Sequence, residues 1–159
     1  MAEAPVVNAS PLIVLGRAGH LDLLQILGEK VIVPAAVTDE VTEHSDEAAR
    51  AIGARAWIER APAEPVSPAV AAWDLGPGES AVLSWAARHP GTLAVIDDYA
   101  ARTCAAVISV PVIGTLGLVL RAKARGRVPA ARPLVEELRR AGLYLSDALI
   151  REALALVGE

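Results

Sequence analysis

The chain has 159 residues, of which 53% are hydrophobic and 21% are charged, and its formal net charge at pH 7 is −4. This length suits one domain with a real core, and the high apolar content excludes an intrinsically disordered protein. No apolar run approaches the roughly 20 residues of a membrane-spanning helix, so we expect no membrane segment. The N-terminus lacks a secretory-signal pattern, and the single cysteine, Cys104, cannot form an internal disulfide; both favour a cytoplasmic protein.

Short apolar runs alternate with helical patterns in the first part of the chain. Val6-Val7 predicts a strand, and Ser10 followed by Pro11 predicts a helix with Ser10 as its N-cap. The apolar spacing that follows indicates one or two helices to residue 27, broken near Gly19. The next predicted elements are a strand at 31–33, a helix from Pro34 to Glu43, and a helix from Asp46 to about Arg60.

The second part of the chain continues this alternation. The proline-rich stretch 61–68 predicts a surface crossing between layers that is too short to separate two domains. Residues 110–113 predict a strand at an edge of the sheet, because Pro111 cannot donate a ladder hydrogen bond. The other predicted elements are a strand at 93–96 and helices at 79–88, from Asp97-Asp98 onward, from Gly114-Thr115 onward, at 132–141 and at 146–156.

This alternation predicts an α/β fold in which parallel strands carry helices on both faces. In open parallel sheets, functional residues gather outside the carboxyl ends of the strands. Asn8, Asp97 and Asp98 stand just past the carboxyl ends of predicted strands. We therefore expect the functional site at this edge of the sheet.

The acidic residues have two interpretations. Asp97 and Asp98 could cap a helix, and Glu40 and Glu79 could be ordinary residues on helix surfaces. If the four gather around one cavity, they instead predict an Mg²⁺ or Mn²⁺ site, because these cations prefer oxygen ligands. Such an ion activates water and neutralises phosphate charge during phosphodiester hydrolysis.

Basic residues concentrate between 121 and 140, where seven stand against two acidic residues. A basic surface beside a carboxylate site is typical of a metal-dependent nuclease. A solvated helix face with exposed Arg and Lys side chains is an equally good interpretation. Trp73 and Trp85 could stack on bases, although we expect both to be buried.

Several ordered motifs together resemble the PIN-domain ribonucleases, and most closely a PIN-like group labelled as a domain of unknown function. The resemblance covers nearly the whole chain. Its motifs are Val7-Asn8-Ala9-Ser10-Pro11-Leu12-Ile13, Val33-Pro34 with Val37 and Glu40-Val41, Gly76-Pro77-Gly78-Glu79-Ser80-Ala81, Ile96-Asp97-Asp98 with Ala101-Arg102, Gly114-Thr115-Leu116-Gly117-Leu118, Gly142-Leu143-Tyr144-Leu145-Ser146 and Gly158-Glu159.

The resemblance implies a three-layer α/β/α sandwich around a twisted parallel sheet of four to five strands. It also implies a single domain over residues 1–159, with the helices from about residue 128 onward as a family-specific extension, and a homodimer. Many members of this family are toxins: Mg²⁺-dependent endoribonucleases that a small antitoxin protein neutralises. RNA, an antitoxin and a second copy are thus the implied partners.

Carried over residue by residue, the resemblance also implies a site. Asn8 takes the position of the family's first acidic residue, where most active members have aspartate. The amide oxygen can still bind a metal or its water, but one negative charge is lost, so we expect weaker metal affinity. The other implied site residues are Glu40, Glu79 and Asp97 with Asp98 beside it, Ser10 and Thr115 as polar supports, and Arg102 as a phosphate contact or charge partner.

Three hypotheses follow. The first is an Mg²⁺- or Mn²⁺-dependent endoribonuclease in which Arg121, Lys123 and Arg125 hold the RNA backbone. The second is a PIN-like module that has lost chemistry and binds RNA or a protein partner, which the asparagine at position 8 favours. The third is a phosphoacceptor receiver domain. It is disfavoured because an acidic pair should follow the first strand, where Asn8 stands alone.

Overall fold

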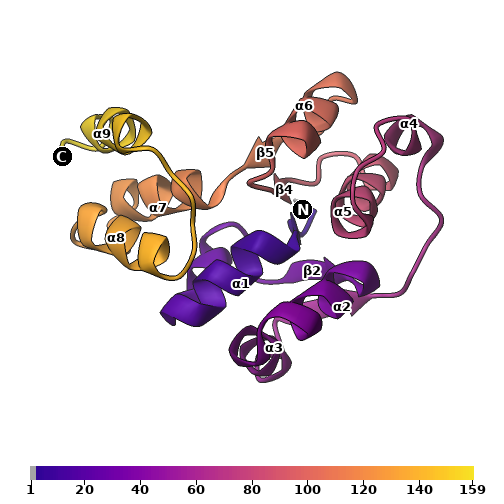
Figure 1. The fold of residues 1–159 in the computed structure, drawn as a ribbon, viewed down its shortest axis with the longest axis horizontal. Helices are drawn as coiled ribbons and strands as arrows, with labels where there is room; N and C mark the ends of the chain where they lie inside the picture. The colour runs from indigo at the N-terminus through magenta and orange to yellow at the C-terminus, as the bar shows by residue number, and fades with distance from the viewer. Residues whose placement is uncertain (1–2) are drawn as a thin grey trace.

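Five parallel strands form one sheet in the computed structural model of the protein, which describes residues 3–159 (Figure 1). Met1 and Ala2, the start of the segment judged to lack a secretory signal and of the predicted 1–159 domain, lie outside the described residues. The strand order is β3-β2-β1-β4-β5. The strands are β1 (Val6–Val7), β2 (Val31–Pro34), β3 (Ile58–Ala61), β4 (Ala94–Val95) and β5 (Val112–Ile113).

Burial follows the position of each strand in the sheet. The central strands β1, β2 and β4 are buried along their whole length, as expected for parallel strands covered by helices on both faces. The edge strand β3 instead buries Ile58 and Ala61 and exposes Glu59 and Arg60. The prediction of parallel strands between helices is therefore confirmed, and so is the edge position of β5.

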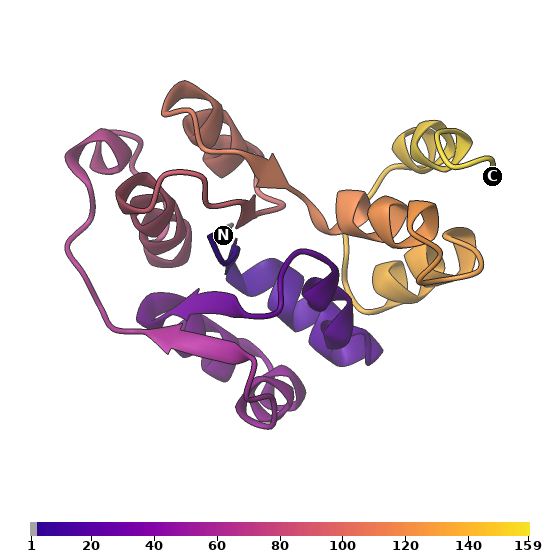
Figure 2. The ribbon, with the colours of Figure 1, turned by 180° about the vertical axis from the view of Figure 1, so that it is seen from behind.

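The helices connect and flank these strands. In chain order they are α1 (Ala9–Ala18), the 3₁₀ helix η1 (Leu21–Ile26), α2 (Ala35–His44), α3 (Asp46–Gly53), α4 (Pro68–Ala71), α5 (Pro77–Arg88), α6 (Tyr99–Val107), α7 (Thr115–Ala124), α8 (Arg132–Arg140) and α9 (Asp147–Ala155). The helices α7, α8 and α9 group at one end of the molecule, and α2 to α5 lie at the other (Figures 1 and 2).

The helix predicted from Asp46 to about Arg60 is wrong in its second half. Helix α3 ends at Gly53, and Ile58–Ala61 forms β3, which pairs with β2 along four residues. Burial at positions 58 and 61 with two exposed residues between them has the spacing of one helical turn and not the period of two of a strand. The pairing partner, which lies more than 20 residues earlier in the chain, decides between them.

The N-cap prediction for Ser10 is also wrong. Helix α1 begins at Ala9, and Asn8 is its N-cap residue with extended backbone angles. Pro11 therefore lies in the first turn, where backbone N–H groups have no intrahelical partner and proline removes nothing. The break near Gly19 is confirmed, since this glycine ends α1 with a φ of 75°. Within residues 3–159 no helix is long and apolar enough to cross a membrane.

Candidate functional site

The carboxyl ends of β1 and β4 bring Asn8 and Asp97 to the same edge of the sheet. These strands are neighbours, with Val7 in register with Val95. The backbone N–H of Asn8 donates to the Val95 carbonyl at 3.0 Å. Asn8 directly follows β1, and Asp97 follows β4 by two residues, so parallel pairing alone places the two side chains at one edge.

Asn8 lies in a cluster with Glu79 from α5 and Glu40 from α2. The Asn8 Nδ2 donates to Glu79 Oε1 at 3.2 Å. Gly78 lets Glu40 approach Asn8, because it has no side chain. A β-carbon on Gly78 would lie 2.8 Å from Glu40 Oε2 and 3.1 Å from Asn8 Oδ1. Side-chain oxygens of Asn8, which follows β1, and of Glu40 in α2 thus meet at the backbone of Gly78, because glycine leaves the space open.

Two oxygens of this cluster are buried and accept no hydrogen bond from residues 3–159: Asn8 Oδ1 and Glu40 Oε2. Asn8 is only 1% exposed. Burial, and secondarily the negative charge of Glu79, raises the pKa of the Glu40 carboxyl, while nearby His44 opposes the shift. A buried acceptor without a donor costs free energy of about 1–3 kcal/mol. A positive charge beside these two oxygens would therefore stabilise the cluster.

Asp97 is held by the start of α7. Its Oδ1 accepts from the backbone N–H of Thr115 at 2.7 Å, and its Oδ2 accepts from the Thr115 hydroxyl at 2.6 Å. Thr115 is fully buried. The exposed Arg102 side chain lies nearby and donates from Nη1 to the Ile96 carbonyl at 3.3 Å. A β-carbon on Gly114 would lie 2.6 Å from that nitrogen and 3.0 Å from Asp97 Oδ1.

Asp98 and Ser10 have different surroundings. Asp98 is exposed and is the N-cap of α6, where its Oδ2 accepts from the backbone N–H of Ala101 at 2.9 Å. This is the capping role that the sequence allowed for the aspartate pair. Ser10 is exposed, and it lines a depression of about 190 Å³ together with Glu40 and His44. It therefore lies on the Glu40 side of the site.

The predicted RNA contacts lie further along α7. Arg121 is six residues beyond Thr115, or about 9 Å along a helix axis. Lys123 donates to the Pro129 carbonyl at 2.7 Å and lies 3.7 Å from a Glu159 carboxylate oxygen, and Arg125 donates to the Ile26 carbonyl at 2.8 Å. Lys123 and Arg125 thus already form hydrogen bonds within the protein. Contact of the three residues with RNA stays a prediction.

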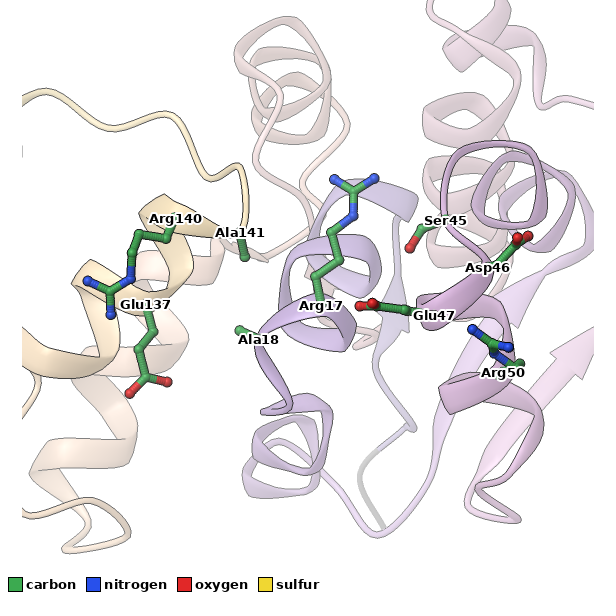
Figure 3. Close-up of a pocket in the computed structure, with 9 residues that line it drawn as sticks. All are labelled: Arg17, Ala18, Ser45, Asp46, Glu47, Arg50, Glu137, Arg140 and Ala141. Atoms are coloured by element: carbon green, nitrogen blue, oxygen red, sulfur yellow. The ribbon is translucent and has the colours of Figure 1, made fainter.

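A second polar depression, of about 830 Å³, lies between α1, α3 and α8. Figure 3 shows Arg17 from α1 in its centre, with Arg140 on one side and Arg50 on the other. Asp46, Glu47 and Glu137 line the same depression, so its three positive and three negative charges cancel. It lacks the strong positive potential that a phosphate backbone attracts, and the site at the strand ends carries the more specific chemistry.

The two close-approach glycines, Gly78 and Gly114, were missed by sequence reasoning. Each lies one residue before a site residue, Glu79 or Thr115, and each is contacted by side-chain atoms of the site. A glycine directly before a polar residue at a helix start was the available signal. It identifies a position where side chains from other elements approach the backbone.

The donor set fits a divalent cation, although it is not a compact carboxylate cluster. No group of three or more His, Cys, Asp or Glu residues within 3–159 is close enough to hold a metal. The residues gathered around Gly78 are one amide and two carboxylates, all oxygen donors. Asn8 Oδ1 and Glu40 Oε2 lie within 3.1 Å of one point and have no protein donor. Oxygen ligands of this type suit Mg²⁺ or Mn²⁺.

Comparison with known proteins adds the family. A family model described as "DUF3368: PIN domain" matches residues 4–159. The chain belongs to this PIN-domain family. PIN domains are commonly nucleases that bind RNA and use divalent metals. No curated protein and no solved structure matched the chain.

The family match agrees with the five-stranded parallel sheet and with the resemblance that the motifs carried. Its range includes α8 and α9, so the matched segment continues to the last residue. The boundaries of the predicted single domain, with its C-terminal extension from about residue 128, stay a prediction. The roles of individual site residues also stay predictions.

Proposed function

We propose that this PIN domain is an Mg²⁺- or Mn²⁺-dependent endoribonuclease that hydrolyses RNA phosphodiester bonds. The observation that carries the proposal is the pair of buried oxygens, Asn8 Oδ1 and Glu40 Oε2, that face one point beside Gly78 without a donor. A cation between them would satisfy both atoms and balance the charge of Glu79, which binds the same asparagine.

Asn8, Glu40 and Glu79 would hold the ion from the β1 side, and Asp97 from the β4 side, with Asp98 next to it. When bound, the ion lowers the pKa of water and neutralises charge on the phosphate. Thr115 holds both oxygens of Asp97 in a fixed orientation. The side chain of Arg102, whose Nη1 donates to the Ile96 carbonyl, would bind the phosphate beside this carboxylate.

The missing negative charge at position 8 supports an alternative to the ribonuclease. An asparagine at position 8 binds a cation more weakly than an aspartate, and its Nδ2 already binds Glu79 at 3.2 Å. A PIN-like module with weakened catalysis that binds RNA or a protein partner is therefore the second candidate. Asn8→Asp separates the two: a gain in Mn²⁺ affinity together with faster RNA cleavage marks a weakened active site, and a gain in affinity without cleavage favours the binding module.

The wider setting is part of the proposal and is carried over from the resemblance of the motifs. A toxin role would need an antitoxin partner, and PIN-family toxins of this kind act in the cytoplasm as homodimers. Size-exclusion chromatography with light scattering tests the dimer. Growth arrest on expression in a bacterial host, relieved by Asp97→Asn, tests the toxin role.

The decisive experiment measures metal and cleavage separately. Calorimetric titration with Mn²⁺ should detect binding to the wild type, and Glu40→Gln should weaken it at least tenfold, whereas Asp39→Asn on the exposed face of the same helix should not. Cleavage of single-stranded and structured RNA should require Mg²⁺ or Mn²⁺ and should be lost in Asp97→Asn. Equal cleavage by wild type and Asp97→Asn would reject the assignment.

A further inference from the structure

The two tyrosines of the chain are unusual in their exposure. The chain has no phenylalanine, two tyrosines and three tryptophans. The three tryptophans pack partly buried against the core. Tyr99 is 85% exposed and Tyr144 is 95% exposed. A protein so poor in aromatic residues leaves both tyrosine rings in water, and folding does not require them there.

Both rings line one groove, of about 680 Å³, and Asp97 lines it too. Tyr99 is the first residue of α6, and Tyr144 lies in the segment between α8 and α9. The helices α6 and α9 stand on opposite sides of β5 in both views (Figures 1 and 2). The groove runs along the open edge strand β5 and reaches the candidate catalytic carboxylate, so it is continuous with the proposed reaction site.

The chemistry of the groove favours bases over phosphates. Its charged lining residues are Arg102, Asp97 and Glu152, and most of its other lining residues are apolar, including Leu116, Leu149 and Leu156. One cation against two carboxylates leaves the groove without the positive charge that would hold a run of phosphates, although Arg102 can bind a single one. Exposed aromatic faces on apolar walls instead suit nucleobases, which stack on such rings whatever their sequence.

We propose that this groove binds unpaired bases of the RNA strand on one side of the scissile phosphate, with bases stacked on Tyr99 and Tyr144. Arg102, which forms no ion pair within the described part of the chain, binds the phosphate beside Asp97. The inference rests on the proposed ribonuclease function, because Asp97 gives the groove its orientation. It adds a site that selects unpaired bases, since duplex bases are already stacked on their neighbours.

The test measures binding without metal, so that cleavage does not interfere. A fluorescein-labelled pentauridylate is titrated with protein in EDTA and followed by fluorescence anisotropy. Tyr99→Ala and Tyr144→Ala should each weaken binding by roughly fivefold to a hundredfold. Tyr99→Phe and Tyr144→Phe should bind like the wild type, because the ring face remains. Val107→Ala, an exposed residue on the same helix as Tyr99 and outside the groove, is the matched control.

Two further measurements locate the bases. An oligonucleotide in which the bases are replaced by abasic sites should bind the wild type as weakly as the Tyr99→Ala/Tyr144→Ala double variant binds pentauridylate. A 5-iodouridine oligonucleotide should photocrosslink to peptides that contain Tyr99 or Tyr144. Unchanged melting temperatures would show that the alanine variants are folded, as expected for side chains this exposed.

Three results would overturn the inference. The first is the same affinity for RNA in wild type and both alanine variants, and the second is no measurable binding by the wild type. The third is a dimer that becomes monomeric in Tyr144→Ala with RNA affinity unchanged, which assigns the groove to a second copy. Failure of the metal site is seen separately, in the Mn²⁺ titration of Glu40→Gln, which contains no RNA.

Discussion

At the scale of single residues, Asn8 joins structure and chemistry. Its backbone N–H continues the pairing of β1 with β4, its side-chain amide binds Glu79, and its Oδ1 faces Glu40 Oε2 across Gly78. An aspartate could not donate to Glu79, and three carboxylates would then repel each other without a cation. Asparagine therefore favours a stable metal-free fold and lowers the electrostatic attraction for metal.

The raised pKa of Glu40 gives a pH-dependent prediction. Burial and the charge of Glu79 disfavour the ionised carboxyl in the folded state, so the folded protein binds the proton more tightly than the unfolded chain and loses stability as pH rises through the raised pKa. In Glu40→Gln the amide is neutral at every pH and can donate to Asn8 Oδ1. We expect the metal-free variant to melt about 2–4 °C above the wild type at pH 7.5, as a gain near 1 kcal/mol would give.

Melting curves at pH 7.5 and pH 4 in EDTA check this. The gain should shrink at pH 4, because the wild-type carboxyl is then increasingly protonated. Asp39→Asn, an exposed change one residue earlier, should show no such pH-dependent gain. A Glu40→Gln protein less stable than the wild type at pH 7.5 would contradict the conclusion that the ionised Glu40 carboxylate destabilises the metal-free protein.

At the scale of elements, two helix starts position the site, and each depends on a glycine. Gly78 lies in the first turn of α5, where alanine would otherwise favour the helix by about 1 kcal/mol. A methyl group there would lie 2.8 Å from Glu40 Oε2 and 3.1 Å from Asn8 Oδ1. We predict that Gly78→Ala weakens Mn²⁺ binding at least tenfold with a small change in stability, because the methyl group occupies the space between the two oxygens.

Gly53→Ala is the matched control for this substitution. Gly53 ends α3 without a positive φ, and a β-carbon there would meet only the end of the Arg60 side chain at 3.9 Å. Calorimetry should find its Mn²⁺ affinity equal to that of the wild type. Unchanged Mn²⁺ affinity in Gly78→Ala as well would contradict a metal site between Asn8 Oδ1 and Glu40 Oε2.

Glu159 connects the end of the chain to α8. Its Oε2 accepts from the backbone N–H of Ala131 at 2.6 Å and its Oε1 from that of Arg132 at 3.0 Å, next to Lys123. These bonds to the N–H groups at the start of α8 lower the pKa of the Glu159 carboxyl. The closing Gly158-Glu159 motif therefore has a structural role: it caps a helix that has no side-chain cap of its own.

We predict that Glu159→Gln lowers the melting temperature by about 2–4 °C at pH 7. A lowered pKa contributes stability above the usual carboxyl pKa, and this contribution is lost as pH falls through the lowered value. The difference from the wild type should therefore shrink steadily as pH falls below the usual range of a glutamate carboxyl. Glu152→Gln changes an exposed residue of α9 that forms no ion pair in the described chain, and it should leave the melting temperature unchanged. An equal loss in both variants would contradict the capping role.

At the scale of the whole molecule, the sequence predicted which strand ends lie side by side. It could not predict which helix side chains reach those strand ends. Parallel alternation places Asn8 and Asp97 at one edge because neighbouring strands share a direction. Glu40 and Glu79 reach that edge only through the packing of α2 against α5, which no local pattern contains, and their place in the site came from family resemblance. The sequence failed to predict the edge strand β3 for the same reason, because its pairing with β2 joins residues far apart in the chain.

The arrangement of charge leads to the last prediction. The chain carries a net charge of −4, so RNA must be held by a few placed cations, and each phosphate contact contributes about 0.7 to the slope of log affinity against log salt for single strands. The side chain of Arg121, half-buried on α7, forms no hydrogen bond or ion pair with the described residues and is free to make such a contact. Arg125 already binds the Ile26 carbonyl, and Lys123 the Pro129 carbonyl.

We therefore expect Arg121→Ala to reduce the salt slope of pentauridylate binding by about 0.7 and to leave the melting temperature unchanged. Arg125→Ala should leave the slope unchanged and lower the melting temperature by about 2–4 °C, because it removes a bond that ties α7 to η1. Anisotropy titrations between 50 and 200 mM salt separate the two. If Arg125→Ala lowers the slope and Arg121→Ala does not, the RNA backbone displaces an internal hydrogen bond, and the cations that hold RNA are those that also hold the fold.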